Sequence, residues 1–123
     1  MITLILLHPL KSITAQSWTF EDEPIIRIGR AMDNHVVLYS AVVSRRHVEV
    51  RQVDEGWQVI SLGANGTYVD GELIFQAPVI DGVILRLARS GPQVQIRLGE
   101  NDSNEVIAGT TLLERFPQTV GSS

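Results

Sequence analysis

The chain has 123 residues, a length that favours a single domain. Hydrophobic residues make up 44% of it, which is enough for a packed core and too many for an intrinsically disordered chain. There is no cysteine, so disulfides, thiolate chemistry and cysteine-based metal sites are excluded. The formal net charge of −4 makes the whole domain a poor candidate for non-specific nucleic-acid binding.

The apolar segments give no sign of targeting to a membrane. Residues 1–7 form an apolar run, but the run is short and no basic residue precedes it, which argues against a signal peptide. No stretch approaches the roughly 20 apolar residues that a membrane-spanning helix needs. We therefore expect no direct membrane insertion and a cytoplasmic protein, and the lack of cysteine is compatible with a reducing compartment.

Short apolar or alternating segments, separated by turn residues, run through the first hundred residues. They predict strands at 2–7, 17–20, 25–28, 36–38, 47–53, 57–60, 67–69, 83–87 and 94–98. Residues 10–17 are expected to form a polar connection, and Asn65-Gly66 is the strongest hairpin signal, with Asp70-Gly71 a second turn of the same chemistry. No convincing amphipathic helix precedes residue 100. The pattern predicts an all-β sandwich.

The composition changes after Gly99. Residues 100–104 are polar and residues 119–123 form a weakly patterned end, with a modest apolar cluster between them. We interpret residues 1–99 as the β-sandwich and residues 100–123 as a C-terminal tail or linker.

Arginine is concentrated in one part of the chain. Five of the ten basic residues lie between positions 27 and 51, where the only acids are Asp33 and Glu49; the five are Arg27, Arg30, Arg45, Arg46 and Arg51. The planar fork of arginine suits a phosphate or carboxylate better than a lysine does. The alternative for Arg27 and Arg51 is a solvated strand face, because both lie in alternating segments.

Three polar groups interrupt the apolar segments at predicted strand ends. They are Gly29-Arg30, Ser44-Arg45-Arg46-His47 and Asn65-Gly66-Thr67. Strand ends and loops are where a scaffold can bring distant side chains together. Arginine, a hydroxyl and an amide in one place suit a phosphate carried by a peptide.

The order of these groups resembles the forkhead-associated (FHA) domain family. The motif, as it stands here, comprises residues 28–30, 33–38, 44–47 and 62–71, and the resemblance covers roughly residues 2–98. It implies a β-sandwich of about eleven strands with ligand loops at one end. It further implies a phosphothreonine-peptide-binding module that mediates phosphorylation-dependent interactions in signalling, without catalytic activity, cofactor or metal, and with a phosphothreonine-containing protein as partner.

The resemblance assigns a role to each motif position. Arg30 and Ser44 would contact the phosphate, Arg45 would add a secondary phosphate or peptide contact, and Asn65 would bond the peptide backbone. The loop-scaffold positions would be Gly29, His47, Gly66 and Thr67. His8 and His35 have no further metal ligands at suitable spacing, so we expect structural or exposed roles for both.

One segment departs from the family pattern. Leu62-Gly63-Ala64 runs straight into Asn65, one residue shorter than is usual, and Ala64 has no hydroxyl. A contact made by the residue before the asparagine would therefore be lost. We expect an effect on selection of the third residue after the phosphothreonine more than on phosphate binding.

Three other interpretations remain open. The sandwich could be structural or self-associating, with a lapsed phosphate site. Ser44 and His47 could form a hydrolase pair, although no glycine-flanked nucleophile elbow and no third orienting acid is present. Phosphorylation of Thr110, Thr111 or Thr119 in the tail could let the chain bind its own site, since tethering raises the effective concentration.

Overall fold

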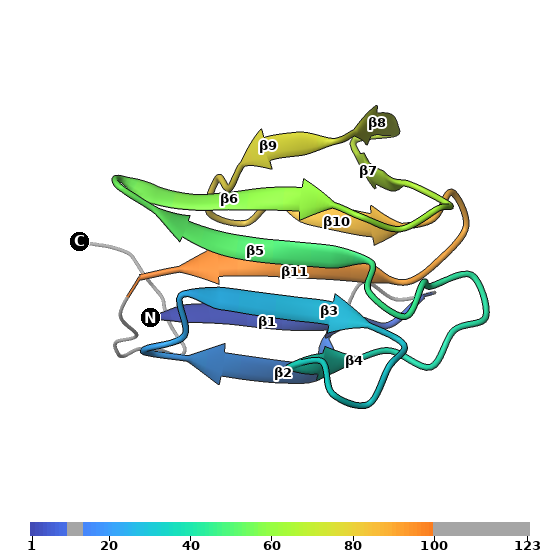
Figure 1. The fold of residues 1–123 in the computed structure, drawn as a ribbon, viewed down its shortest axis with the longest axis horizontal. Helices are drawn as coiled ribbons and strands as arrows, with labels where there is room; N and C mark the ends of the chain where they lie inside the picture. Colours follow the sequence, from blue (N-terminus) through green and yellow to red (C-terminus); the bar gives the residue numbers. More distant parts are fainter. Residues whose placement is uncertain (10–13, 100–123) are drawn as a thin grey trace.

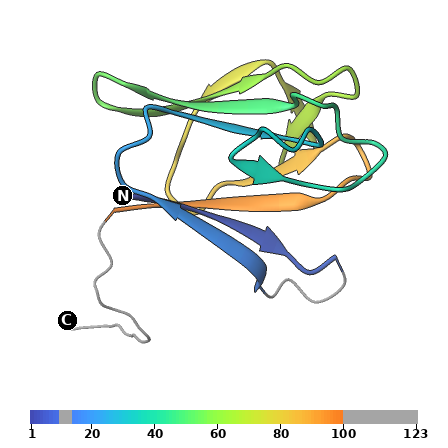
Figure 2. The same ribbon diagram turned by 60° about the horizontal axis from the view of Figure 1, so that its bottom comes forward.

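Two facing β-sheets form the molecule (Figures 1 and 2). This is a computed structural model, which describes residues 1–9 and 14–99. The strands are β1 Ile2–Leu7, β2 Thr14–Phe20, β3 Ile25–Gly29, β4 Val36–Val37, β5 Val48–Val53, β6 Gly56–Ser61, β7 Thr67–Val69, β8 Glu72–Ile74, β9 Gln76–Pro78, β10 Ile84–Leu87 and β11 Gln93–Leu98. Within this part of the chain there is no helix. The predicted all-β sandwich is confirmed.

The strands divide between the sheets in an order that differs from their order along the chain. One sheet runs β2-β1-β11-β10-β7-β8 and the other runs β4-β3-β5-β6-β9. The β3–β4 pair is parallel, and the other pairs are antiparallel. The six-stranded sheet therefore combines early, middle and late strands, and the five-stranded sheet takes its strands from residues 25–78. This arrangement holds the loops of distant segments at common ends.

The core lies between the sheets and follows from the alternation of apolar residues. Successive strand residues point to opposite faces, so every second side chain turns inward. Fully buried examples are Leu4, Ile26, Ile28, Val50, Leu85 and Ile96. Each such side chain contributes about 1.5–3 kcal/mol by leaving water. Trp18 and Trp57 pack against this core while remaining partly exposed.

The two predicted turns of Asn-Gly type have different outcomes. Asp70-Gly71 joins β7 to β8 as a hairpin, with both φ angles positive at 51° and 80°, as a type I′ turn requires. The hairpin predicted at Asn65-Gly66 is wrong. The strands on either side of it, β6 and β7, belong to different sheets, and the segment crosses from one layer to the other.

Two tertiary contacts explain why Asn65-Gly66 does not close a hairpin. Thr67 is fully buried and its Oγ1 lies 2.8 Å from the Oγ of Ser61. The carbonyl of Gly66 accepts a 2.8 Å hydrogen bond from the N–H of Ala88, at the end of β10. The positive φ of 83° at Gly66 meets the local turn preference, but these contacts direct the chain to the other sheet.

The N-terminal part of β2 is a second difference from prediction. Residues 14–17 belong to this strand, not to a polar connection, and Thr14, Gln16 and Ser17 pair with β1. They are exposed because β2 is the edge of its sheet, so apolar alternation is not needed there. The three-residue strands β8 and β9 are further additions whose brevity leaves no alternating pattern.

Four loops gather at one end of the sandwich, on the right in Figure 1. They join β3 to β4, β4 to β5, β6 to β7 and β10 to β11. The first three carry the polar groups singled out in the sequence, so the expectation that these groups meet at one end is confirmed. The tail interpretation of residues 100–123 lies outside the described residues.

Candidate functional site

Arg30 follows the last residue of β3 and is exposed. Its backbone N–H donates to the carbonyl of Ser44 at 2.9 Å, and its Nε donates to the carbonyl of Val43 at 3.0 Å. These bonds fix the side chain through its backbone and its Nε, and no carboxylate in the described part of the chain pairs with it. The two Nη groups therefore remain available to bind an oxyanion as a fork.

Ser44 lies in the loop between β4 and β5, beside Arg30. Its Oγ accepts a 3.2 Å hydrogen bond from the backbone N–H of Ala64, in the loop between β6 and β7. An oxygen that accepts from one side keeps its own hydrogen to donate elsewhere. The hydroxyl is thus oriented by the protein and can donate to a ligand oxygen.

Asn65 lies next to Ala64 and is exposed. Its Nδ2 donates to the carbonyl of Val42 at 3.0 Å, which ties the β6–β7 loop to the β4–β5 loop a second time. Among the described residues its Oδ1 has no donor, so an acceptor remains for a backbone N–H of a bound peptide.

His47 joins the β4–β5 loop to the β6–β7 loop. Its side chain is fully buried. Nδ1 accepts the backbone N–H of Ser44 at 3.0 Å, and Nε2 lies 2.8 Å from the carbonyl of Gly66. Because Nδ1 accepts, the ring is the neutral tautomer in which Nε2 carries the hydrogen and donates it to Gly66.

The main chain of His47 extends this role. Its N–H donates to the carbonyl of Ile28 at 2.9 Å, and its carbonyl accepts the N–H groups of Leu62 at 2.8 Å and Gly63 at 3.1 Å. Burial lowers the pKa of the imidazole, partly offset by the hydrogen bond to the backbone of Gly66. His47 is therefore neutral and links the β4–β5 loop to the β6–β7 loop and to strand β3.

The geometry at His47 also bears on hydrolase chemistry. Both ring nitrogens are engaged with backbone groups, of Ser44 and of Gly66. A general base must reach the hydroxyl of its nucleophile, yet the imidazole bonds the main chain of Ser44 and the hydroxyl bonds Ala64. The structure does not bring the two groups together as a catalytic pair.

Gly29 and Gly63 lie where a side chain would collide with a neighbouring part of the chain. A Cβ on Gly29 would lie 2.2 Å from the carbonyl oxygen of Arg45, and one on Gly63 would lie 2.6 Å from Cγ and Nδ1 of His47. Real Cβ atoms do not approach backbone or ring atoms this closely. These contacts leave no room for a side chain at either position; Gly29 was predicted as a scaffold residue, and Gly63 was not singled out in the sequence.

Asn34 is a buried residue that the sequence motif did not single out as functional. Only 7% of it is exposed, and its Nδ2 donates to the carbonyls of Ala31 at 2.8 Å and Arg45 at 2.7 Å. Its Oδ1 accepts from Nη1 of Arg46 at 2.8 Å. It fastens the β3–β4 loop to the loop that carries Ser44. An Asp-Asn pair in a turn is too common a signal to have revealed this.

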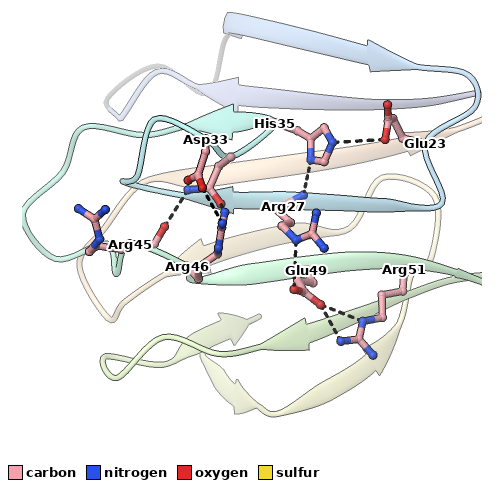
Figure 3. Close-up of polar contacts among 9 residues, drawn as sticks. Glu23, Arg27, Asp33, His35, Arg45, Arg46, Glu49 and Arg51 are labelled. Atoms are coloured by element: carbon pink, nitrogen blue, oxygen red, sulfur yellow. Dashed lines mark hydrogen bonds and ion pairs between the residues drawn. The ribbon is translucent and has the colours of Figure 1, made fainter.

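Figure 3 separates the arginines by their partners. Asp33 pairs with Arg46 at 2.8 Å. Glu49 pairs with Arg51 at 2.7 Å and with Arg27 at 3.6 Å. The two acids of the segment thus engage three of its five arginines. Arg27 and Arg51 lie on the strand faces of β3 and β5, in agreement with the alternative considered for them.

Arg45 belongs with Arg30 in having no carboxylate partner among the residues described. Its side chain is exposed and extends away from the ion pairs in Figure 3. Its backbone carbonyl accepts from Asn34 and from the N–H of Ala31 at 3.2 Å, so the main chain is fixed while the guanidinium is free.

The contacts of His35 are those of a structural residue. Nδ1 of His35 accepts the N–H of Arg27 at 3.0 Å, Nε2 lies 3.3 Å from Glu23, and Phe20 packs edge-on against the ring. Over residues 1–9 and 14–99 there is no cluster of three or more side chains suited to a metal ion. In the same ranges no helix is long and apolar enough to cross a membrane.

Comparison with known proteins agrees with this arrangement. The sequence pattern of the FHA domain matches residues 26–88, just over half of the chain. This protein belongs to the FHA domain family. The glycogen accumulation regulator GarA of Mycolicibacterium smegmatis is 39% identical over 62 residues, a match that covers 50% of this chain and 39% of GarA. The chain thus spans about two fifths of that relative's length.

Solved FHA domains superpose over most of the chain. One, from a study of phosphothreonine-dependent FHA domain interactions, has 26% identity and a TM-score of 0.67, and the match covers 81% of this chain and 98% of that one. The FhaA FHA domain, complexed with the intracellular domain of another protein, has 26% identity and a TM-score of 0.66 over 79% of this chain and 100% of its own. The family assignment made from the sequence motif is confirmed.

Proposed function

We propose that this FHA domain binds phosphothreonine-containing peptides and proteins and so mediates phosphorylation-dependent interactions in signalling. The observation that carries the proposal is the pairing of Arg30 and Ser44. Their main chains are joined by a 2.9 Å hydrogen bond, and an unpaired guanidinium and an oriented hydroxyl lie on adjacent loops. The solved relative studied for phosphothreonine-dependent interactions supports it.

Each proposed contact uses a donor or acceptor that the fold leaves available. Arg30 and Ser44 bind the phosphate, Asn65 bonds the peptide backbone, and Arg45 adds a contact from the rim. Charge-assisted hydrogen bonds contribute about 1.5–3 kcal/mol each. Three such bonds, less the cost of ordering the peptide, correspond to roughly micromolar affinity.

Gly29, His47, Gly66 and Thr67 act as the loop scaffold in this proposal. His47 bonds the main chain of Ser44 and of Gly66, and Thr67 bonds Ser61 beneath the crossing segment. None of the four needs to touch the ligand. The domain acts without catalysis, cofactor or metal, and a cytoplasmic location is part of the same proposal.

The loss of a hydroxyl at Ala64 does not by itself argue for a lapsed site. What Ala64 contributes is its backbone N–H, which orients the hydroxyl of Ser44 at 3.2 Å. An alanine supplies this N–H as well as any other residue. The effect of the shortened loop is therefore expected on selectivity for residues near the phosphothreonine.

The experiment compares a phosphothreonine peptide library with the same peptides unphosphorylated, by fluorescence anisotropy. We expect binding that depends on the phosphate and that weakens in Ser44→Ala, while Ser17→Ala, an exposed serine on β2, leaves it unchanged. Equal weak binding of both peptide forms would favour the structural or self-associating sandwich. Ester turnover that disappears in Ser44→Ala would favour the hydrolase.

A further inference from the structure

A polar hollow of about 400 Å³ lies on the six-stranded sheet, beside β7 and β10. Its lining includes Tyr68, Asp70, Arg86, Arg89 and Gln93. None of these belongs to the candidate phosphate site described above. The hollow has polar groups and two guanidinium groups but no assigned role.

The two arginines of the hollow are held in place without a carboxylate partner. The guanidinium carbon of Arg89 lies 5.4 Å from the centre of the Tyr68 ring, a cation–π contact. Nη1 of Arg86 donates to the carbonyl of Gly91 at 3.2 Å. Within the described ranges neither forms an ion pair. Both therefore present positive charge that no acid of the fold neutralises through a direct contact.

Asp70 is the acid in the lining, so two positive charges face one negative charge. Asp70 is the first residue of the type I′ turn at the end of β7, and its backbone φ is 51°. The local balance favours an anion although the whole chain has a formal charge of −4. Arginine held by an aromatic face retains its terminal N–H groups for a carboxylate or phosphate.

The hollow adjoins the loop that carries Asn65. Tyr68 packs beside Gly66, so that a Cβ on this glycine would lie 3.4 Å from Cε1 of the ring. The N–H of Ala88 bonds the carbonyl of Gly66 at 2.8 Å, which joins the loop bearing Arg89 to the same segment (Figure 1). The Tyr68 ring therefore contacts both Gly66, the neighbour of Asn65 in sequence, and the guanidinium of Arg89.

We propose that this hollow binds an acidic group, a carboxylate or a second phosphate, on the polypeptide whose phosphothreonine occupies the Arg30–Ser44 site. The inference rests on the proposed function, because that site brings the acidic group to the hollow. An extended peptide advances about 3.3 Å per residue, so a peptide that passes Asn65 and continues along Tyr68 is directed toward Arg89.

The experiment measures anisotropy with phosphothreonine peptides that carry three glutamates, or three glutamines, on either the N-terminal or the C-terminal side. We expect glutamate on one side to tighten binding by about two- to five-fold, the effect typical of an exposed ion pair. Arg89→Gln should remove this gain. Asp70→Asn should increase it, since asparagine suits the same turn. The control is Arg97→Gln, because Arg97 is exposed and paired with Asp81.

Equal binding of the glutamate and glutamine peptides, both still dependent on the phosphothreonine, would overturn the inference and leave the proposed function standing. If no phosphothreonine peptide binds, the proposed function fails. The NMR signals of the Arg86 and Arg89 Nε–H groups then show separately whether the hollow binds an acidic group. Shifts with an unphosphorylated glutamate peptide would support an acidic polypeptide as ligand. Shifts with inorganic phosphate alone would support a second phosphate as the bound group, and shifts with neither probe would overturn the inference.

Discussion

The backbone N–H of Ser44 donates to Nδ1 of His47 at 3.0 Å, and the opposite nitrogen of the same buried ring bonds the carbonyl of Gly66 at 2.8 Å. One imidazole therefore holds both the loop with the proposed phosphate contact and the loop with the proposed backbone contact. This works only for the neutral ring, because a proton on Nδ1 would face the N–H of Ser44.

The first prediction concerns the pH dependence of folding. His47 in the unfolded chain titrates near its ordinary pKa of 6.5, and burial lowers the pKa in the folded protein. Between these two values the unfolded state holds a proton that the folded state lacks. The contribution of His47 to the free energy of unfolding is complete above about pH 6.5 and decreases as the pH falls toward the lowered value, by at most about 1.4 kcal/mol per pH unit.

Urea denaturation of the wild type and of His47→Asn between about pH 5 and 8 measures this contribution. Asparagine keeps an acceptor for the N–H of Ser44 but does not titrate in this range. We expect the variant to be less stable and to have a smaller loss of stability on acidification. An identical pH slope in both proteins would contradict the assignment to His47.

The second prediction concerns Gly63. A Cβ at this position would lie 2.6 Å from the ring of His47, so Gly63→Ala should displace the ring that holds Ser44. We expect destabilisation of about 1–3 kcal/mol, as for other overpacked cores, together with weaker phosphopeptide binding. Chemical denaturation and anisotropy measure the two effects.

Gly82→Ala, in the turn before β10, is the matched control for this prediction. A Cβ at Gly82 would meet only Nε2 of Gln95, at an ordinary 3.9 Å, but its φ of 90° is unfavourable for alanine. It should lower the stability by about 1–2 kcal/mol through backbone strain alone and leave peptide affinity unchanged. The explanation fails if both variants weaken binding equally.

The third prediction concerns Asn34. Its amide donates two hydrogen bonds and accepts one from Arg46 in a nearly buried position, so Asn34→Ala should lower the free energy of unfolding by about 1–3 kcal/mol. Asp33→Asn is the control, because the Asp33–Arg46 pair is largely exposed and should contribute less than about 1 kcal/mol. Denaturation midpoints that fall equally in both variants would refute a special role for Asn34.

Much of the fold was predictable because alternation reports directly on burial. The segments around Val48 and Val50, or Val94 and Ile96, have buried apolar residues at every second position, as the sequence indicated. The edge strand β2 was predicted short because both of its faces are exposed near Thr14. Its register against β1 comes from backbone hydrogen bonds, which leave no pattern in the side chains.

The Asn65-Gly66 segment marks the limit of local turn chemistry. A glycine with positive φ fits a hairpin and a crossing segment equally well, and the choice is made by Ser61, Thr67 and Ala88. Distant partners of this kind cannot be read from a dipeptide. The Asp70-Gly71 turn was predictable because its two strands pair with each other and nothing distant competes.

The sequence located the arginine cluster, but it could not show which arginines pair with an acid and which do not. Arg27 faces Glu49 across the β3–β5 pair, and Arg51 reaches the same carboxylate along its own strand. Arg46 reaches Asp33 across two loops. Only the register and the loop packing show that Arg30 and Arg45 have no carboxylate partner among the described residues, while Arg27, Arg46 and Arg51 each pair with an acid.

The fourth prediction tests whether Arg30, which has no carboxylate partner, binds the phosphate while a paired arginine does not. Anisotropy titration of a phosphothreonine peptide with the wild type, Arg30→Ala and Arg51→Ala compares an unpaired arginine with one paired to Glu49. We expect Arg30→Ala to weaken binding by at least about tenfold with the fold intact, since a charge-assisted bond is lost. Arg51→Ala should bind as the wild type does. Unchanged affinity in Arg30→Ala, or equal losses in both variants, would contradict phosphate recognition at Arg30.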